Sequence, residues 1–229
     1  MKSSLRLLSL CAALTAGAGS AHATLVMWQG QVTGAGTTPA TTLFTTVNGA
    51  APQLFDVGNL TGDRSFEFIY NAGVGGASQA LIGSQAAVAG AQGLKVNQWN
   101  NTGMYGVTDF GVVDVVSPIP FLQNQNVHIV FTSNGVDTLM YLNGSLSHTF
   151  GGTDLTITGV NGIGAAVNAA GTGFFDNLAG DVLGFASYDS ALSPAEILTH
   201  SQAFAAVPEP SASGLAILAG LAAARRRRR

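Results

Sequence analysis

Carboxylates are the first residues in this sequence from which chemistry would be expected. Glu67 and Glu196 are the only glutamates between residues 24 and 206, and glycoside hydrolysis needs two carboxyl groups flanking the scissile bond. Glu196 is explained by a helix cap. Glu67 alternates with aromatic residues along a predicted strand, and we expect it on an exposed strand face. A Glu-x-Asp-x-Glu strand motif, which would pair carboxyl groups, is absent, so hydrolysis is disfavoured.

Histidines and nucleophiles offer no recognisable catalytic set either. His128 and His148 fall within one predicted three-stranded meander and are interpreted as ordinary strand-face side chains, while His200 falls in the last turn of a predicted helix, where its charge would suit the dipole. The only cysteine is Cys11. No Gly-x-Ser-x-Gly elbow and no Gly-Lys-Ser/Thr phosphate loop is present. The sequence therefore predicts a protein that is not an enzyme.

Sugar binding would normally use an aromatic platform. The sequence has two tryptophans; Trp28 falls in a predicted first strand, and we expect it in the core. The second tryptophan is flanked by amides, which suit sugar hydroxyls. The predicted glycan contacts are Asn97, Gln98, Trp99, Asn100 and Asn101. The alternative interpretation of this segment is a half-buried strand end.

Calcium is the one ion for which the sequence holds candidate ligands. Calcium takes six to eight oxygen ligands, and Asp176 and Asn177 in a glycine-rich loop, with Asp63 or Asp109 elsewhere, would supply some of them. No calcium loop of fixed spacing exists, so these residues are better explained as turn formers. No cofactor and no metal site is predicted, and calcium stays an alternative.

Alternating apolar residues indicate strands along the whole middle of the chain. Phe66, Phe68 and Tyr70 share one face at a period of two. Residues 127–132, 138–142 and 145–150 alternate similarly and are separated by Ser-Asn-Gly and Asn-Gly turns, which predicts a meander. Ser193, Pro194 and Glu196 predict a helix start with a capping box. Many short strands and one helix favour an all-β, two-sheet antiparallel jelly-roll sandwich.

Two stretches carry a family resemblance. His-Ile-Val-Phe at residues 128–131, followed by Thr-Leu-Met-Tyr-Leu-Asn-Gly at 138–144, resembles the middle hairpin of LamG-like, concanavalin A-like jelly rolls. Residues 178–183 and 188–197 resemble the closing strand and helix turn of that family, with Asp181 as a structural hydrogen-bonding residue. The resemblance admits glycosidases, lectins, structural modules and calcium at a loop rim, so function has to be argued from a site.

The first 23 residues are typical of a secretory signal peptide. Lys2 and Arg6 form the positive region, residues 7–17 the apolar stretch, and Ala21 and Ala23 the small residues of the cleavage site. Cleavage would remove Cys11, so the exported chain would hold no thiol and no disulfide.

The last 23 residues combine a short motif, an apolar run and a basic end. The motif is Val207, Pro208, Glu209 and Pro210. The apolar run at 211–224 is short for a membrane-spanning helix, and the membrane stop is Arg225, Arg226, Arg227, Arg228 and Arg229. This order resembles the PEP-CTERM sorting signal of Gram-negative bacteria. The resemblance implies transient inner-membrane anchoring and cleavage by an exosortase in a host that makes exopolysaccharide.

The segment between the two signals is strongly acidic. Residues 24–206 contain eleven Asp or Glu and two Lys or Arg, a formal net charge of −9. Nucleic-acid binding relies on Lys and Arg that neutralise phosphates, so nucleic acid is excluded as a partner.

Together these patterns predict three parts: a signal peptide at 1–23, a LamG-like jelly-roll domain at 24–206 and a sorting signal at 207–229. The predicted partners are the export machinery, an exosortase-type processing enzyme, and an exopolysaccharide or a surface protein. The predicted location is the cell surface, outer envelope or extracellular matrix, with a non-catalytic adhesion or glycan-binding role in an exopolysaccharide or biofilm. The alternatives are a divergent jelly-roll glycoside hydrolase and a calcium-dependent protein-binding module.

Overall fold

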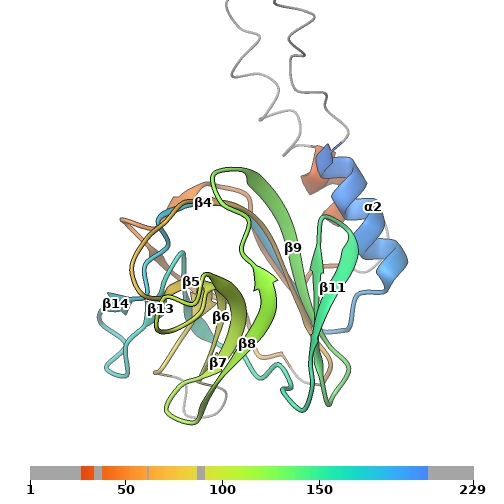
Figure 1. Cartoon of the computed structure of the whole chain (residues 1–229). Helices are drawn as coiled ribbons and strands as arrows, with labels where there is room; N and C mark the ends of the chain where they lie inside the picture. Colours follow the sequence, from red (N-terminus) through yellow and green to blue (C-terminus); the bar gives the residue numbers. More distant parts are fainter. Residues whose placement is uncertain (1–26, 34–37, 61, 87–90, 206–229) are drawn as a thin grey trace, which may run out of the picture.

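The computed structural model describes residues 27–33, 38–60, 62–86 and 91–205 (Figure 1). The predicted signal peptide and sorting signal, with Ala21, Ala23, the motif at 207–210 and the arginines at 225–229, lie outside these residues. Within the described part, no helix is long and apolar enough to cross a membrane.

The described chain folds into two antiparallel sheets packed face to face. The seven-stranded sheet has the order β1-β15-β4-β9-β10-β11, with β2 also paired to β15. Its strands are β1 (Thr41–Leu43), β2 (Val47–Asn48), β4 (Ser65–Ala72), β9 (Asn126–Ser133), β10 (Thr138–Leu142), β11 (Ser145–Phe150) and β15 (Gly180–Tyr188). The predicted all-β, two-sheet sandwich is confirmed.

The six-stranded sheet has the order β3-β12-β5-β6-β7-β8. Its strands are β3 (Gln53–Asp56), β5 (Gln79–Gly83), β6 (Gln92–Asn97), β7 (Met104–Asp109), β8 (Val113–Pro120) and β12 (Val160–Ile163). A separate hairpin of β13 (Ala166–Val167) and β14 (Phe174–Phe175) follows β12. Pro118 and Pro120 fall in β8, an edge strand, where a missing N–H disturbs the hydrogen-bond ladder least.

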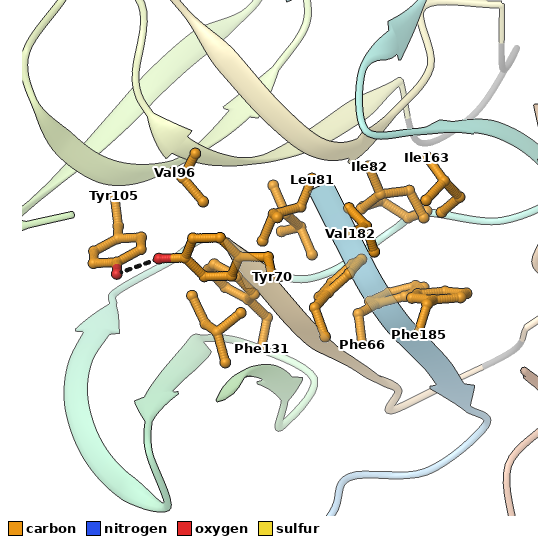
Figure 2. Close-up of a cluster of buried hydrophobic side chains, with 14 of the residues drawn as sticks. Phe66, Tyr70, Leu81, Ile82, Val96, Tyr105, Phe131, Ile163, Val182 and Phe185 are labelled. Carbon is orange, nitrogen blue, oxygen red and sulfur yellow. Dashed lines mark hydrogen bonds between the residues drawn. The ribbon is translucent and has the colours of Figure 1, made fainter. Parts of the chain in front are cut away.

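The core lies between the sheets and follows the predicted alternation. Phe66, Phe68 and Tyr70 of β4 are fully buried and face the six-stranded sheet. Figure 2 shows Phe66 and Tyr70 beside side chains such as Leu81 from the opposite sheet. A hydrogen bond of 2.6 Å joins the hydroxyls of Tyr70 and Tyr105 across the sandwich (Figure 2). The period of two in the sequence therefore located the inner face of β4 correctly.

The predicted meander is confirmed as β9, β10 and β11. Asn143 and Gly144, between the second and third of these strands, both have positive φ, at 48° and 85°. This is the backbone that a two-residue hairpin turn requires, and it explains the Asn-Gly pair. A Cβ on Gly144 would also come within 3.0 Å of Ser201, so the turn packs directly against the C-terminal helix.

Two helical segments lie side by side over the outer face of the seven-stranded sheet (Figure 1). Helix α2 (Pro194–Ala205) begins with the predicted capping box: the Ser193 backbone N–H donates to Glu196 at 2.8 Å, and the Glu196 N–H donates to the Ser193 hydroxyl at 3.3 Å. The other segment is residues 27–33. Trp28 belongs to it, so the predicted first strand at Trp28 is wrong, although its predicted burial is confirmed. Trp28 and Val32, four residues apart, share the buried helix face.

Candidate functional site

An open pocket of about 480 Å³ lies on the outer face of the six-stranded sheet, over β6, β7 and β8. Its size is within the range of small-molecule sites. It is lined by Gln85, Lys95, Trp99, Thr108, Asp109, Phe110, Gly111, Val112, Val113, Asp114, Phe175 and Asp176. Aromatic rings and carboxylates thus meet in one concave surface.

The alternation of side chains along β6 explains which residues form the floor of this pocket. Leu94 and Val96 of β6 point into the core, so Lys95 between them points to the outer face. Gly93 keeps that face flat beside Lys95: a Cβ there would lie 2.9 Å from the Phe110 ring. The absence of a side chain at Gly93 therefore allows Phe110 to lie close against the sheet.

Lys95 is buried, and its side chain is held by contacts within the floor of the pocket. Its side chain is 1% exposed, forms an ion pair with Asp176 and donates to the Ser78 hydroxyl at 3.0 Å. Its ammonium lies 5.1 Å from the Phe110 ring centroid and 5.9 Å from that of Phe175. Burial lowers the pKa of Lys95, and the nearby Asp176 opposes that shift. The one cation of the pocket is thus already paired.

The remaining charged groups of the pocket are negative. Asp114 is exposed and accepts a hydrogen bond of 2.8 Å from the Thr108 hydroxyl. The same hydroxyl also lies 2.9 Å from the side-chain oxygen of the buried Gln98. Asp109, at the end of β7, completes the lining on that side. Among the described residues, Asp109 and Asp114 form no ion pair, although Asp114 is near enough to Lys95 for its charge to favour the protonated lysine.

The predicted glycan-contact segment divides into supports and exposed residues. Trp99 is 59% exposed and lines the pocket, and Asn100 and Asn101 are exposed in the adjoining turn. Asn97 and Gln98 are buried. Their amides hold the turn instead: Asn97 accepts from the Gly103 N–H at 2.9 Å, and Gln98 donates to the Val107 carbonyl at 3.1 Å. The half-buried strand end considered for this segment does not describe Trp99, which is mostly exposed, or Asn97 and Gln98, which are buried.

Several lining residues lay outside the sequence-based prediction. Lys95, Asp114 and Phe175 come from three separate segments, and no motif joins them. One signal was available: Lys95 alternates with Leu94 and Val96, and it is one of only two Lys or Arg residues between positions 24 and 206. A rare cation in an apolar strand of an acidic domain indicates a buried ion pair.

A second polar cluster is centred on Glu67, and it corrects the prediction of an exposed strand face. Glu67 is fully buried beneath α2 and residues 27–33. Its carboxylate lies 2.6 Å from His128 Nε2 and 3.2 Å from His200 Nδ1. It also accepts from the Tyr188 hydroxyl at 2.6 Å and from the Trp28 indole at 3.3 Å. The strand face is covered because two helical segments pack on it.

Charge in this cluster is stabilised by contacts rather than by solvent. Burial raises the pKa of Glu67, but hydrogen bonds and charge from His128 and His200 outweigh it and hold this pKa well below its usual range. Burial and the Glu67 carboxylate raise the pKa of Tyr188 well above its usual value. Glu67 is therefore a sealed anion that joins β4, β9, β15, α2 and residues 27–33.

The histidines are arranged differently from the prediction. His200 lies in the middle of α2 and is buried against Glu67, not in the last turn facing solvent. His148 pairs with Met140, which pairs with Phe131, so it lies on the face opposite His128. Its ring packs edge-on against Phe150, 4.6 Å away, and burial lowers its pKa. The structure thus brings His128 together with His200 and separates it from His148.

The candidate calcium ligands are dispersed. Asp176 pairs with Lys95, Asn177 donates to the Gly49 carbonyl at 2.9 Å, and Asp109 lies in the pocket. Asp63 lies near Gly135, in the turn after β9. Among the described residues, no group of three His, Cys, Asp or Glu side chains is placed to hold a metal ion. Asp181 accepts from Asn48 at 2.8 Å, as expected of a structural residue.

A sequence profile described as the concanavalin A-like lectin/glucanases superfamily, of the laminin G type, matches residues 45–198. The chain belongs to this superfamily. The match covers more than half of the chain and agrees with the resemblance carried by the two hairpin and helix-turn stretches. No curated protein matches the chain significantly.

Solved structures with the same fold include carbohydrate-binding modules. The CBM40 module of the Ruminococcus gnavus IT-sialidase, solved with α2,3-sialyllactose, is 14% identical with a TM-score of 0.55; the match covers 71% of this chain and 99% of that one. Domain 4 of AbnA, an extracellular arabinanase from Geobacillus stearothermophilus solved with arabinotriose, is 13% identical with a TM-score of 0.52, over 69% and 75% of the chains.

The NanB sialidase of Streptococcus pneumoniae matches over a smaller share of its length. It is 16% identical with a TM-score of 0.52, and the match covers 70% of this chain but 28% of the sialidase. At these identities the likeness concerns the fold, and what this chain binds has to be argued from its own pocket.

Proposed function

We propose that this protein is an exported, non-catalytic glycan-binding module, and that the pocket over β6, β7 and β8 is its ligand site. One observation carries the proposal: Trp99, 59% exposed, stands at the edge of a concave pocket whose interior offers carboxylate and hydroxyl groups. An exposed indole is costly in water and useful against the apolar face of a sugar ring. The neighbouring polar groups would then fix the orientation of the sugar.

The backbone at Trp99 is held by hydrogen bonds from its neighbours, which favours binding. Buried Asn97 and Gln98 precede it and hydrogen-bond to the backbone around it. Gly106 makes this possible, because a Cβ there would lie 2.8 Å from the Gln98 side chain. A platform that is already ordered loses little conformational entropy when a ligand binds.

The place of the pocket in the fold suits a surface-attached protein. Helix α2 ends at Ala205, on the outer face of the seven-stranded sheet (Figure 1). The pocket lies on the outer face of the opposite sheet. If the segment 207–229 acts as a sorting signal cleaved by an exosortase, attachment through that end would leave the pocket facing away. A matrix exopolysaccharide is the ligand that this arrangement would reach.

Three aspartates in one pocket are the observation that favours the alternative of a hydrolase. A general acid must hold a proton while its partner stays charged. Asp176 is held by Lys95, and Asp114 accepts from the Thr108 hydroxyl; both carboxylates are therefore engaged as acceptors by groups of the chain itself. We therefore propose binding without cleavage, and release of reducing ends from the bound glycan would overturn that part of the proposal.

Titration calorimetry with the exopolysaccharide of the source organism tests the proposed function. We expect saturable binding that Trp99→Ala weakens by about tenfold or more. Leu146→Ala is the matched control, because Leu146 is 54% exposed and lies in β11 of the other sheet. Absence of heat for the unmodified chain, or equal weakening by both variants, would contradict glycan binding at this pocket.

A further inference from the structure

We propose that the pocket selects glycans bearing free amino groups and discriminates against carboxylated or sulfated ones. This inference rests on the proposed glycan-binding function and names its ligand class. The pocket joins two carboxylates that form no ion pair within the described part of the chain, Asp109 and Asp114, to an exposed Trp99 and to the Phe110 ring. A protonated sugar amine fits both kinds of group, since carboxylates pair with ammonium and aromatic faces attract it.

The described part of the chain has no cation to offer an anionic sugar. Its Lys and Arg residues are Arg64 and Lys95. Arg64 is largely buried and donates to the carbonyls of Gly62 and Ile157, away from the pocket. Lys95 is 1% exposed and paired with Asp176. A uronate, sialate or sulfate group would therefore enter beside Asp109 and Asp114 with no positive partner, and like charges at close range repel.

The pocket already contains one example of the proposed contact. The Lys95 ammonium lies over the Phe110 ring, 5.1 Å from its centroid, and against the Asp176 carboxylate. Phe110 and Phe175 pack edge to face with centroids 5.4 Å apart, so both rings are fixed. Asp114 and Trp99 line the same pocket and are exposed, so they offer the same kinds of group, a carboxylate and an aromatic ring, to an incoming ligand.

The negative charge of the whole domain also favours a cationic ligand over an anionic one. Between residues 24 and 206 the formal net charge is −9. A concave site lined by one sign of charge concentrates ligands of the opposite sign and speeds their association. Selectivity should therefore weaken with added salt, because exposed charges are screened within about 10 Å at 0.1 M ionic strength.

Three hexasaccharides that differ mainly in charge test this inference on the full-length chain: a glucosamine hexamer, an N-acetylglucosamine hexamer and a galacturonate hexamer. At about pH 5, where the amines of a glucosamine oligomer are protonated and aspartates are still charged, we expect the glucosamine hexamer to bind about fivefold more tightly than its acetylated form. The galacturonate hexamer should show no binding that depends on Trp99. Counting only the binding that Trp99→Ala removes separates the pocket from the arginines at 225–229.

Asp114→Asn is the decisive variant, because it removes charge and keeps the oxygen that accepts from Thr108. It should bring the affinities of the glucosamine and N-acetylglucosamine hexamers within about twofold of each other. Asp189→Asn, an exposed aspartate beyond the end of β15, makes the same change in net charge and should leave the preference intact.

The outcomes separate the two proposals. Equal Trp99-dependent binding of the acetylated and free-amine hexamers would overturn amine selectivity while supporting glycan binding. Tighter Trp99-dependent binding of the galacturonate would overturn the charge argument in the same way. If none of the three hexamers and no exopolysaccharide binds through Trp99, the proposed function itself fails.

Discussion

The two outer faces of the sandwich each carry a group of charged and aromatic residues. Helical segments cover the group on one face, whereas the group on the other face is open to solvent. On the seven-stranded sheet, Glu67 lies beneath α2 and residues 27–33, with each carboxylate oxygen accepting hydrogen bonds. On the six-stranded sheet, Lys95 and Asp176 are paired, but Trp99 and Asp114 above them stay exposed. A sealed cluster in which both carboxylate oxygens are hydrogen-bonded stabilises the fold, whereas an open one with exposed groups is available to a ligand.

Similar groups have a structural role in one cluster and a proposed binding role in the other. Both clusters place a carboxylate against nitrogen donors and aromatic rings. At Glu67 the donors come from elements far apart in the sequence, so the cluster ties both ends of the described chain to the sheet. The ion pair of Lys95 and Asp176, by contrast, forms only the floor of the pocket. Four predictions follow, and they test whether the first cluster acts on stability and the second on binding.

Glu67→Leu should give the largest loss of stability. The substitution leaves His128, His200 and the Tyr188 hydroxyl buried without their shared acceptor, and removal of one partner from a buried polar set costs about 3–5 kcal/mol. Urea unfolding followed by circular dichroism measures the change. A loss below about 1 kcal/mol would show that the cluster does not hold the helical segments in place.

Acid should destabilise the protein through the same residue. The pKa of Glu67 is lowered in the folded state, so the stabilisation is complete above the unfolded pKa of about 4.3 and is lost as the pH falls through the folded pKa. We expect the Tm to fall by more than about 5 °C between pH 6 and pH 3. Glu67→Gln should flatten this dependence, and an equally steep curve in that variant would assign the acid sensitivity to other carboxylates.

Lys95→Met should cost about 2 kcal/mol, less than Glu67→Leu, because the Asp176 side chain left behind is 13% exposed and regains some solvent. The double variant Lys95→Met, Asp176→Asn should recover part of the loss, since no unpaired charge remains. Thermal unfolding of the four combinations gives the coupling between the two residues. Additive losses would mean that the ion pair contributes nothing to the pocket floor.

Trp99→Ala should have the smallest effect on stability, within about 0.5 kcal/mol, while it weakens glycan binding by about tenfold or more. The indole is mostly exposed, and the turn is held by Asn97 and Gln98 instead. Measuring Tm and affinity on the same preparation separates the two quantities. A large fall in Tm would place Trp99 with the structural residues and end the distinction between the two clusters.

The amino-acid sequence by itself determined the elements whose signals are local. The aromatic alternation in β4, the Asn-Gly turn at residues 143–144 and the capping box at Ser193 each depend on neighbouring residues, and each is confirmed. Trp99 could likewise be singled out, because a tryptophan among amides is a local pattern. These features together were enough for the all-β sandwich and its family.

Tertiary structure alone decided which polar residues are buried. Strand alternation assigned Glu67 to the face opposite the core, but it carries no information on the helical segments that cover that face. For the same reason it could not predict that Asn97 and Gln98 are buried while Trp99 is exposed. It also could not predict the ion pair between Lys95 and Asp176, which lies 81 positions away. Burial and pairing depend on contacts between distant segments, and a local pattern determines only the direction in which a side chain leaves its own strand.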